Sequence, residues 1–255
     1  LCLVPMGLRA ARLDEERLVG YLHDQWKTNP PGATSVLQAV DATLPRLSLV
    51  PLVATARALR SMNLLEIGRT AEAITALEVL HDAPETPPAL VEWCKRWLTR
   101  LDREKVREAL TAVYRREIRF PDTLDSLKFL TPPPPLSDRW GTPWRYRLTP
   151  LKRIRDVEAQ SYSLESVTLG RLSDLATVLT QPRPETPAIR PIGLVSSPAG
   201  QAPPMIRFET TRSPVEQAIL SERTSWKGVA LIYVGESIVI LVENDFLFVL
   251  RRPER

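Results

Sequence analysis

The sequence predicts a protein of the α+β class. Apolar residues recur at helical spacing through the first half of the chain, from about residue 11 to 118. Alternating apolar and polar residues then indicate paired strands within 144–166, and short apolar runs separated by turns indicate an antiparallel meander between about 190 and 255. With 255 residues, the chain is long enough for two or three domains of ordinary size.

These patterns divide the chain into four regions. The first is an array of short antiparallel helices, and the second combines a helix with an antiparallel sheet. The third is a proline-rich linker with its entry loops, and the fourth is a small all-β meander domain. Their expected boundaries are 1–100, 101–180, 181–204 and 205–255.

The first region contains five stretches of helical periodicity. They cover residues 14–26, 33–44, 51–65, 70–82 and 89–101. Prolines lie between most of them, and each proline removes a backbone donor and interrupts a helix. The region is therefore expected to fold as consecutive antiparallel helices.

A denser motif lies between the third and fourth stretches, in LRSMNLLEIGRTAEAITALEVL. Gly68 and Arg69 form the turn, and Glu72 and Ala73 begin the next helix. The small side chain of Ala73 lets two helices approach closely. The segment resembles one tetratricopeptide unit, although no clean second copy follows at the spacing of about 34 residues that such repeats have. A generic helical hairpin is the alternative.

The second region begins with the helix LDREKVREALTAVYRREIRF, whose Val106, Leu110 and Val113 share one face. Pro121 ends this helix, and PDTLDSLKFL begins a short second one. In WRYRL, the side chains of Trp144, Tyr146 and Leu148 alternate with arginines and are expected to face inward. SYSLESV repeats the alternation, so the two strands are expected to pair across the intervening loop, residues 149–160.

Between these helices and strands lies SDRWGTPWRYRL, residues 137–148, which is rich in aromatic side chains in a chain that is only 6% aromatic. Gly141 stands between a tryptophan and a proline, where it permits a turn with positive φ. Asp138 can accept backbone N–H bonds in that turn. We expect Trp140 to pack beneath the sheet against the helix, so the stretch is interpreted as a structural corner.

This region resembles the globular part of the major pseudopilin of type II secretion systems and of related type IV pilin-like proteins. In that family a long helix ends in an aromatic–proline pair, a short helix follows, and a corner leads into a strand. The resemblance covers residues 101–166. The matching residues are Phe120, Pro121, Leu124, Leu127, Asp138, Trp140, Gly141, Pro143, Trp144, Tyr146, Tyr162, Leu164 and Ser166.

The sequence departs from the family's pattern in three respects. Arg139 and Thr142 replace a proline and an asparagine of the corner. The loop that holds calcium in the pseudopilin corresponds to 166–174, where Asp174 is the only carboxylate, so we expect neither a metal site nor a cofactor. The family's cleavage motif and long apolar helix are replaced by the helical array, and we do not expect the chain to polymerise as a pilin does.

The fourth region is expected to contain the strands VALIYV, SIVILV and FLFVL, with RPIGLVSS and MIRFET supplying two more. Its ending is similar to the small periplasmic β domain of the type II secretion inner-membrane clamp protein and of the pilus assembly lipoprotein. The residues that carry this similarity are Gly228, Leu231, Val234, Ile238, Ile240 and Leu250.

The composition argues against nucleic-acid binding and catalysis. The net charge is +4, and the basic residues are interleaved with acidic ones rather than gathered on one face. The chain has only two cysteines and two histidines, which are too few to suggest a metal site or a histidine-based triad: Cys2, Cys94, His23 and His81. We expect Cys94 in a helical core, both histidines on helix surfaces, and no catalytic residues.

These observations predict a non-enzymatic scaffold subunit of a bacterial envelope assembly of the type II secretion or type IV pilus kind. Its partners would be other protein subunits, and its location periplasmic or at the inner membrane. The alternative is an accessory subunit of another large membrane-associated complex that uses a pilin-like module for packing. The apolar start LCLVPMGL leaves two alternatives open, a membrane anchor or signal upstream of residue 1 and a plain apolar chain end.

Overall fold

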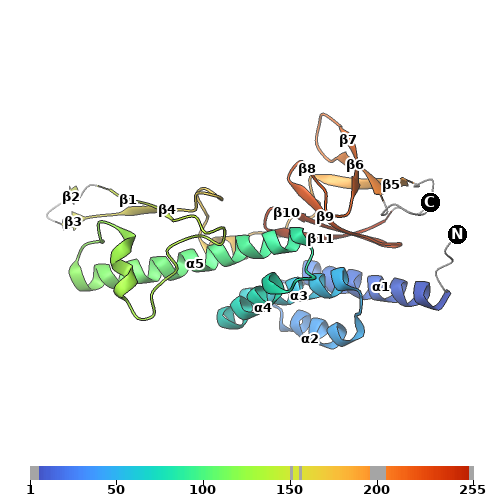
Figure 1. Cartoon of the computed structure of the whole chain (residues 1–255), viewed down its shortest axis with the longest axis horizontal. Helices are drawn as coiled ribbons and strands as arrows, with labels where there is room; N and C mark the ends of the chain where they lie inside the picture. The colour runs from blue at the N-terminus through green and yellow to red at the C-terminus, as the bar shows by residue number, and fades with distance from the viewer. Residues whose placement is uncertain (1–5, 150–151, 155–156, 196–204, 253–255) are drawn as a thin grey trace. The chain divides into compact units, whose positions relative to one another are not determined.

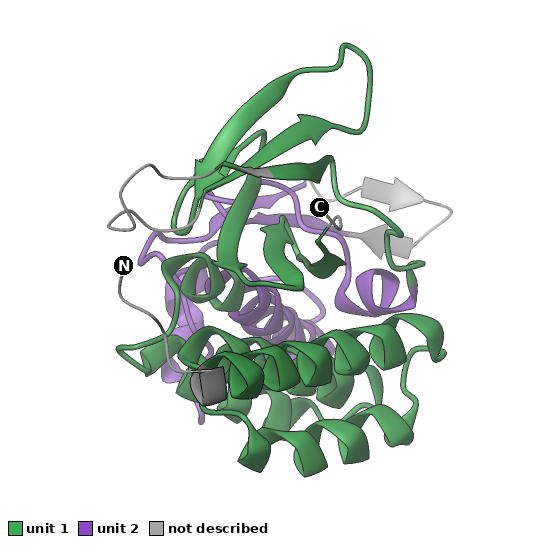
Figure 2. Cartoon of the chain, turned by 90° about the vertical axis from the view of Figure 1, so that its right-hand side faces the viewer, with its two compact units in different colours: residues 1–94, 181–255 green, residues 95–180 purple. Residues whose placement is uncertain are grey.

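The structure is a computed structural model that describes residues 6–149, 152–154, 157–195 and 205–252, and it contains two compact units. Unit 1 consists of residues 1–94 and 181–255, and unit 2 of residues 95–180 (Figure 2). Helices occupy the N-terminal region and antiparallel sheets the C-terminal region, which confirms the mixed helix and sheet content expected from the sequence.

The unit boundaries differ from the predicted domains in two ways. Helix α5, Pro88–Glu117, crosses the boundary expected at residue 100 without a break, because no proline or glycine interrupts its periodicity. The helical array and the C-terminal strands, which were expected as separate domains, form one unit.

The helices of unit 1 follow one another with short connections, and α3 contacts α1, α2 and α4. Pro51 lies in the first turn of α3, where the missing N–H costs no helical hydrogen bond. Leu52, Leu59 and Leu64 of α3 are fully buried, so this helix is the centre of the helical core. The elements are α1 (Met6–Thr28), α2 (Thr34–Thr43), the 3-10 turn η1 (Leu44–Arg46), α3 (Val50–Glu66) and α4 (Thr70–Asp82) (Figure 1).

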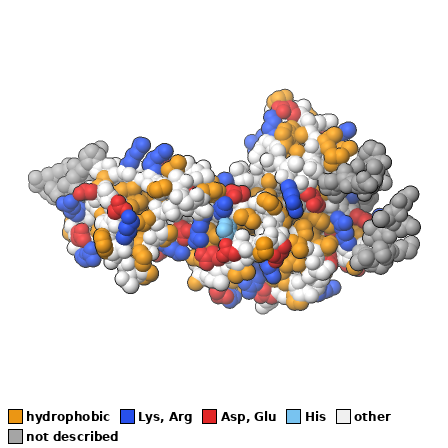
Figure 3. Space-filling model, in the orientation of Figure 1, with side chains coloured by type: hydrophobic (Ala, Val, Ile, Leu, Met, Phe, Trp, Pro, Cys, Tyr) orange, Lys and Arg blue, Asp and Glu red, His pale blue; other side chains and the backbone are white. Residues whose placement is uncertain are grey.

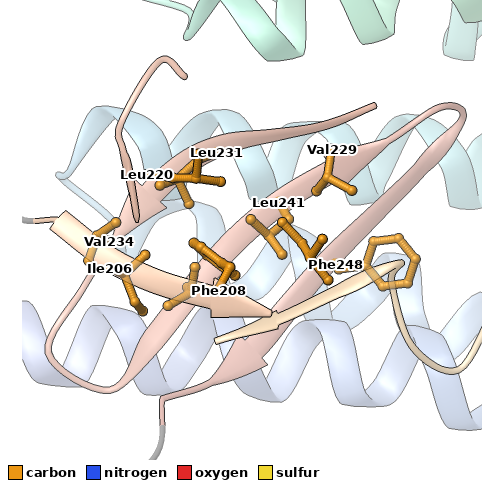
Figure 4. Close-up of a cluster of buried hydrophobic side chains, with 10 residues drawn as sticks. Ile206, Phe208, Leu220, Val229, Leu231, Val234, Leu241 and Phe248 are labelled. Atoms are coloured by element: carbon orange, nitrogen blue, oxygen red, sulfur yellow. The ribbon is translucent and has the colours of Figure 1, made fainter. Parts of the chain in front are cut away.

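The described strands of unit 1 form two antiparallel sheets. A three-stranded sheet has the order β5-β6-β7, and a four-stranded meander has the order β11-β10-β9-β8, which confirms the predicted hairpins. Ile206 and Phe208 of β6 pack with Leu231 and Leu241 of the meander in one buried cluster (Figure 4). The strands are β5 (Ile189–Val195), β6 (Met205–Thr210), β7 (Gln217–Ser221), β8 (Ser225–Trp226), β9 (Val229–Val234), β10 (Ile238–Glu243) and β11 (Phe246–Arg251).

A buried carboxylate joins α1 to the meander. Glu16 is 0% exposed and accepts hydrogen bonds from Tyr233 Oη at 2.8 Å, from Ser237 N and Oγ at 2.7 Å, and from Glu236 N at 3.1 Å. Burial acts to raise the pKa of Glu16, but these hydrogen bonds outweigh it and hold the pKa below its usual value. Gly235 lies so close that an added Cβ would stand 2.4 Å from Glu16 Oε1. The β9–β10 turn is thus shaped around this side chain.

A buried arginine ties the start of the expected linker to the helices. Arg183 forms two 2.7 Å bonds to the Glu66 carboxylate and donates to Asn29 O at 3.0 Å. Its guanidinium lies 4.2 Å from the centre of the Trp26 ring, where a cation is attracted to the ring face. The predicted linker therefore begins with a packed segment, and it also includes strand β5.

The expectation that His23 lies on a helix surface is wrong. His23 is 5% exposed, and its ring lies 5.9 Å from that of Trp26. Burial is the main reason that its pKa falls to about 4, so the imidazole is neutral at pH 7. Cys94 lies in the core as predicted, and burial raises its pKa to about 12.

Unit 2 packs a β-hairpin on the second part of α5. Strands β1 and β4 pair antiparallel, and β2 pairs with β3 further along the same hairpin, so the loop predicted at 149–160 contains two short strands. The core contains Val106, Leu110 and Val113 of α5 together with Leu127 and Trp144. The elements after α5 are the 3-10 helix η2 (Leu124–Phe129), β1 (Arg145–Leu148), β2 (Lys152–Ile154), β3 (Val157–Ala159), β4 (Tyr162–Glu165) and α6 (Leu175–Thr180).

Two surface properties concern the expected partners. On the face drawn in Figure 3, basic and acidic side chains are interleaved over both units. In the described part of the chain, no helix has both the length and the hydropathy that a membrane span requires.

We expect Glu16→Ala to lower the free energy of unfolding by about 3 kcal/mol, because four donors would lose their acceptor in a buried position. Urea denaturation measures the change. The matched control is Asp14→Ala on the same helix, whose side chain is 71% exposed and pairs with the exposed Arg17. This control should cost less than about 0.5 kcal/mol, and an equal cost for both variants would contradict the role of Glu16.

Candidate functional site

The corner of unit 2 is organised by one carboxylate. Asp138 is 3% exposed, and its Oδ1 accepts the backbone N–H groups of Trp140 at 3.1 Å and Thr142 at 3.0 Å. Its Oδ2 accepts the hydroxyls of Ser166 at 2.8 Å and Thr168 at 3.0 Å. The expectation that Asp138 accepts backbone N–H bonds in the turn is confirmed. The two hydroxyl contacts were missed, because they come from the segment that follows β4.

These bonds set the ionisation of the carboxylate. Burial acts to raise the pKa of Asp138 and is the largest single influence. The donors from Ser166, Thr142, Thr168 and Trp140 together outweigh it, so the pKa lies below its usual value. Asp138 is therefore a stable anion with its oxygens engaged.

The turn itself follows the predicted geometry. Gly141 has a φ of +80°, in the left-handed region that favours glycine. Asp138 N–H donates to Thr142 O at 2.8 Å, and Gly141 N–H donates to Asp138 O at 2.9 Å. A β-bridge between Ser137 and Pro143 closes the loop immediately before β1. The stretch forms a hydrogen-bonded corner.

The inward orientation expected for Trp144 is confirmed, whereas Trp140, which was expected to pack beneath the sheet, is only partly buried. Trp144 is the buried ring, with 6% exposure, and its Nε1 donates to Pro135 O at 3.0 Å. Trp140 is only half-buried, and the Lys95 Nζ lies 6.0 Å from the centre of its ring. The alternation along β1 explains the difference, because Trp144 has the same parity as Tyr146 and both side chains turn inward.

The aromatic–proline pair after α5 contacts the hairpin. Tyr146 Oη donates to Pro121 O at 2.9 Å, and burial raises the pKa of this phenol to about 12. The Phe120 ring packs between Tyr114 at 4.5 Å and Tyr162 at 4.7 Å, measured between ring centres. The structure thus brings together the corner, the end of α5 and the hairpin, as the sequence motif suggested.

The predicted helical-hairpin turn is also present. Gly68 has a φ of +79°, and two backbone bonds close the end of α3, from Gly68 N to Leu65 O and from Arg69 N to Leu64 O. Arg69 pairs with Glu72 on the exposed surface, and Ala73 is fully buried. These residues shape the α3–α4 turn and lie in a different unit from the corner.

Each unit has a groove on its surface. The groove of unit 1 has a volume of 620 Å³ and lies between α1 and the β10–β11 hairpin, with Tyr21, Ile238 and Val249 in its wall. The groove of unit 2 has a volume of 450 Å³ and lies between β4 and the arginines Arg103 and Arg107 of α5. Neither groove was predicted from the sequence, because each is formed by segments that are distant in sequence.

A metal ion at the corner would have to displace existing hydrogen bonds and an ion pair. Ser166 and Thr168 both donate to Asp138, and Asp174 pairs with Arg107, so these oxygens already have partners. Within the described residues, no group of three or more His, Cys, Asp or Glu side chains has a metal-binding arrangement. The expectation of no calcium stays a prediction.

We expect Trp144→Ala to lower the free energy of unfolding by about 3–5 kcal/mol, as for other large-to-small core changes. Trp140→Ala is the matched control, and it should cost less than half as much because that side chain is only partly buried. Chemical denaturation of the two variants checks the order. A larger loss for Trp140→Ala would restore the original expectation.

Asp138→Asn should lower the free energy of unfolding by about 2 kcal/mol at pH 7, because four donors lose a charged acceptor. Since the folded-state pKa is lowered, the contribution is present above the unfolded pKa of about 3.9 and is lost as the pH falls through the folded-state pKa.

The difference in the free energy of unfolding between wild type and Asp138→Asn should therefore become smaller below about pH 4. Denaturation curves at pH 7 and pH 3 measure this difference. The control is Asp125→Asn, whose side chain is 75% exposed beside Lys128. A gap of the same size at both pH values would contradict the assignment.

Comparison with known proteins finds no matching family model, no matching curated protein and no matching solved structure. The resemblance of residues 101–166 to pseudopilins therefore rests on the residues quoted from the sequence and stays a hypothesis.

Proposed function

We propose that the chain is a non-enzymatic scaffold subunit of a bacterial envelope assembly of the type II secretion or type IV pilus kind, acting through protein–protein contacts. The observation that carries this proposal is the corner of unit 2. The aromatic–proline pair, the short helix, the corner and the hairpin follow α5 in the order of the pseudopilin motif. Phe120 and Pro121 contact the hairpin, Asp138 holds Ser166 after it, and Leu127 of the short helix lies in the same core.

The polar groups of the corner form hydrogen bonds within unit 2, which supports a structural role. All four bonds to Asp138 connect parts of unit 2, and the Trp144 indole is satisfied by a backbone carbonyl. A catalytic carboxylate needs free access to a substrate and a pKa suited to proton transfer. Asp138 is instead buried and held as an anion.

Cys94 and His23 also have environments that favour packing over chemistry. The buried Cys94 thiol has a pKa raised to about 12, so little thiolate forms at pH 7. His23 has a pKa lowered to about 4 and is shielded from solvent. Both side chains act as core residues in this proposal.

One observation favours the second candidate, an accessory subunit of another membrane-associated complex. The first turns of α5 belong to the core of unit 1, where Trp93 is 1% exposed and its Nε1 donates to Asp245 O at 3.0 Å. The helix of the pilin-like module is therefore also a core helix of a different unit. A helix that contributes to the cores of both units is expected if the pilin-like module acts only as a packing element.

Affinity purification of the tagged chain from cross-linked membranes of its source cells, followed by mass spectrometry, tests the proposal. We expect secretion or pilus subunits to be enriched over a purification from untagged cells. Enrichment of one other membrane complex, with no secretion or pilus component, would overturn the proposal in favour of the second candidate.

A further inference from the structure

The hairpin of unit 2 has an edge strand with unused backbone groups. Thr149 N–H donates to Ser161 O at 2.8 Å, which places these two residues in a hydrogen-bonded pair. Pairs alternate along an antiparallel ladder, so the opposed residues Tyr146 and Leu164 form a non-hydrogen-bonded pair. The backbone N–H and C=O groups of Tyr162 and Leu164 therefore point away from β1.

The two edges of the hairpin differ. On the β1 side, Trp144 N–H donates to Leu136 O at 3.3 Å, and the Ser137–Pro143 bridge covers the strand's start. On the β4 side, no bond from another described residue reaches the outward groups of Tyr162 and Leu164. The edge of β4 is thus the open edge of a two-stranded sheet, and sheets generally need three or more strands for stability.

The unit 2 groove lies along this open edge. Its wall contains every residue from Gln160 to Glu165, whose side chains alternate between the two faces of the hairpin. A groove that touches consecutive residues is bounded by the strand's edge rather than by one face. The opposite wall is formed by α5 and by Phe120, and the hairpin lies along this helix (Figure 1).

Three arginines line the groove. Arg103 and Arg107 are paired with Glu104 and Asp174, and Arg171 and Glu165 also belong to the lining. Unit 2 as a whole contains 17 Lys and Arg and 11 Asp and Glu, a net charge of +6 within a chain of net charge +4. An acidic partner is therefore attracted to this unit in particular.

Two donors remain for a further carboxylate although part of the cluster is balanced. Arg103 and Arg107 share the carboxylates of Glu104 and Asp174, so two cations face two anions. The Nε of Arg103 has no hydrogen-bond partner among the described residues, although its side chain is only 11% exposed. Arg171 is exposed and forms no ion pair with a described residue.

The spacing of the arginines fits an extended peptide. Arg103 and Arg107 are four residues apart on α5, which corresponds to about 6 Å along the helix axis. Side chains on one face of a strand recur about every 6.6–6.8 Å. Acidic residues at alternate positions of a strand would meet successive arginines.

We propose that an extended acidic segment of a partner protein, with carboxylates at alternate positions, adds to the open edge of β4 as a third antiparallel or parallel strand. Its backbone pairs with Tyr162 and Leu164, and its helix-facing carboxylates pair with Arg103 and Arg107. This inference rests on the proposed function, because it takes protein contacts to be the activity of the chain. Strand addition supplies affinity through the backbone, while the arginines select the charge.

An extended peptide fits this groove better than a nucleic acid does. Single-stranded nucleic acids bind basic grooves through aromatic rings that stack on bases. The aromatic rings nearest the groove, Phe120 and Tyr162, already pack on each other with 4.7 Å between ring centres. The free backbone groups of β4 have the spacing that a peptide strand matches.

The test is fluorescence anisotropy of the full chain with a fluorescein-labelled (Glu-Thr)4 peptide. We expect saturable binding that weakens with added salt, and no binding of the matched (Lys-Thr)4 peptide. The acidic peptide N-methylated at alternate amides should lose at least about tenfold in affinity, because it cannot donate to the strand edge. Absence of saturable (Glu-Thr)4 binding would overturn the proposal, as would equal binding of the N-methylated peptide.

The double variant Arg103→Gln, Arg107→Gln should weaken peptide binding about tenfold or more. The control is Arg115→Gln, Arg116→Gln, which removes the same charge from exposed positions of the same helix and should leave binding within about twofold.

Arg171→Gln is a further variant, and it changes an exposed side chain rather than a buried one. It should also weaken binding of the acidic peptide. Equal effects of the groove variants and the control variants would overturn the proposal. Tighter binding of a labelled oligothymidylate of the same charge, lost in the groove variants, would assign the groove to nucleic acid instead.

The two proposals fail separately. Recovery of secretion or pilus subunits together with no peptide binding would remove the strand-addition proposal and leave the scaffold function intact. Peptide binding without any envelope component in the purification would remove the proposed envelope function and leave the strand-addition proposal intact.

Discussion

The hydrogen bonds to the Asp138 carboxylate are the interaction on which the form of unit 2 depends. One oxygen holds the turn that leads into β1, and the other holds the hydroxyls that follow β4, 28 residues further along the chain. A carboxylate suits this position because both oxygens only accept, and together they offer about four acceptor sites. A two-stranded hairpin has only marginal stability by itself. The hydrogen bonds of the corner and the packing on the apolar face of α5 provide the additional stability.

Buried charges have the same function in unit 1. Glu16 connects α1 to the β9–β10 turn, and Arg183 connects the segment before β5 to Glu66 and Trp26. Each charge is surrounded by partners, which compensates the cost of removing it from water. These connections explain why the N-terminal helices and the C-terminal sheets form one unit although they are far apart in sequence.

The functional consequence lies in what remains available at the surface. The polar groups of the corner are engaged, and Cys94 and His23 are core residues. Among the described residues, the grooves and the edge of β4 offer surface that these bonds do not use, and the arginines of α5 lie beside that edge. The proposed recognition of an acidic, extended segment rests on these features.

The sequence by itself determined the local elements. Periodicity located the helices and the meander strands, and turn chemistry located Gly68 and the corner with Asp138 and Gly141, because these signals act within a few residues. Alternation along β1 also placed Trp144 inward, but only the tertiary structure decided that Trp140 stays partly exposed, because the period of a strand does not extend into the turn before it.

The tertiary structure also decided that the helical array and the β region form one unit. Glu16 contacts a residue 217 positions away, and Arg183 contacts one 117 positions away. The groove beside β4 arises in the same way, because α5 and β4 approach only after the chain has turned at the corner. No local pattern encodes such a pairing, because the energy of a buried charge depends on donors and acceptors that the fold supplies from elsewhere in the chain.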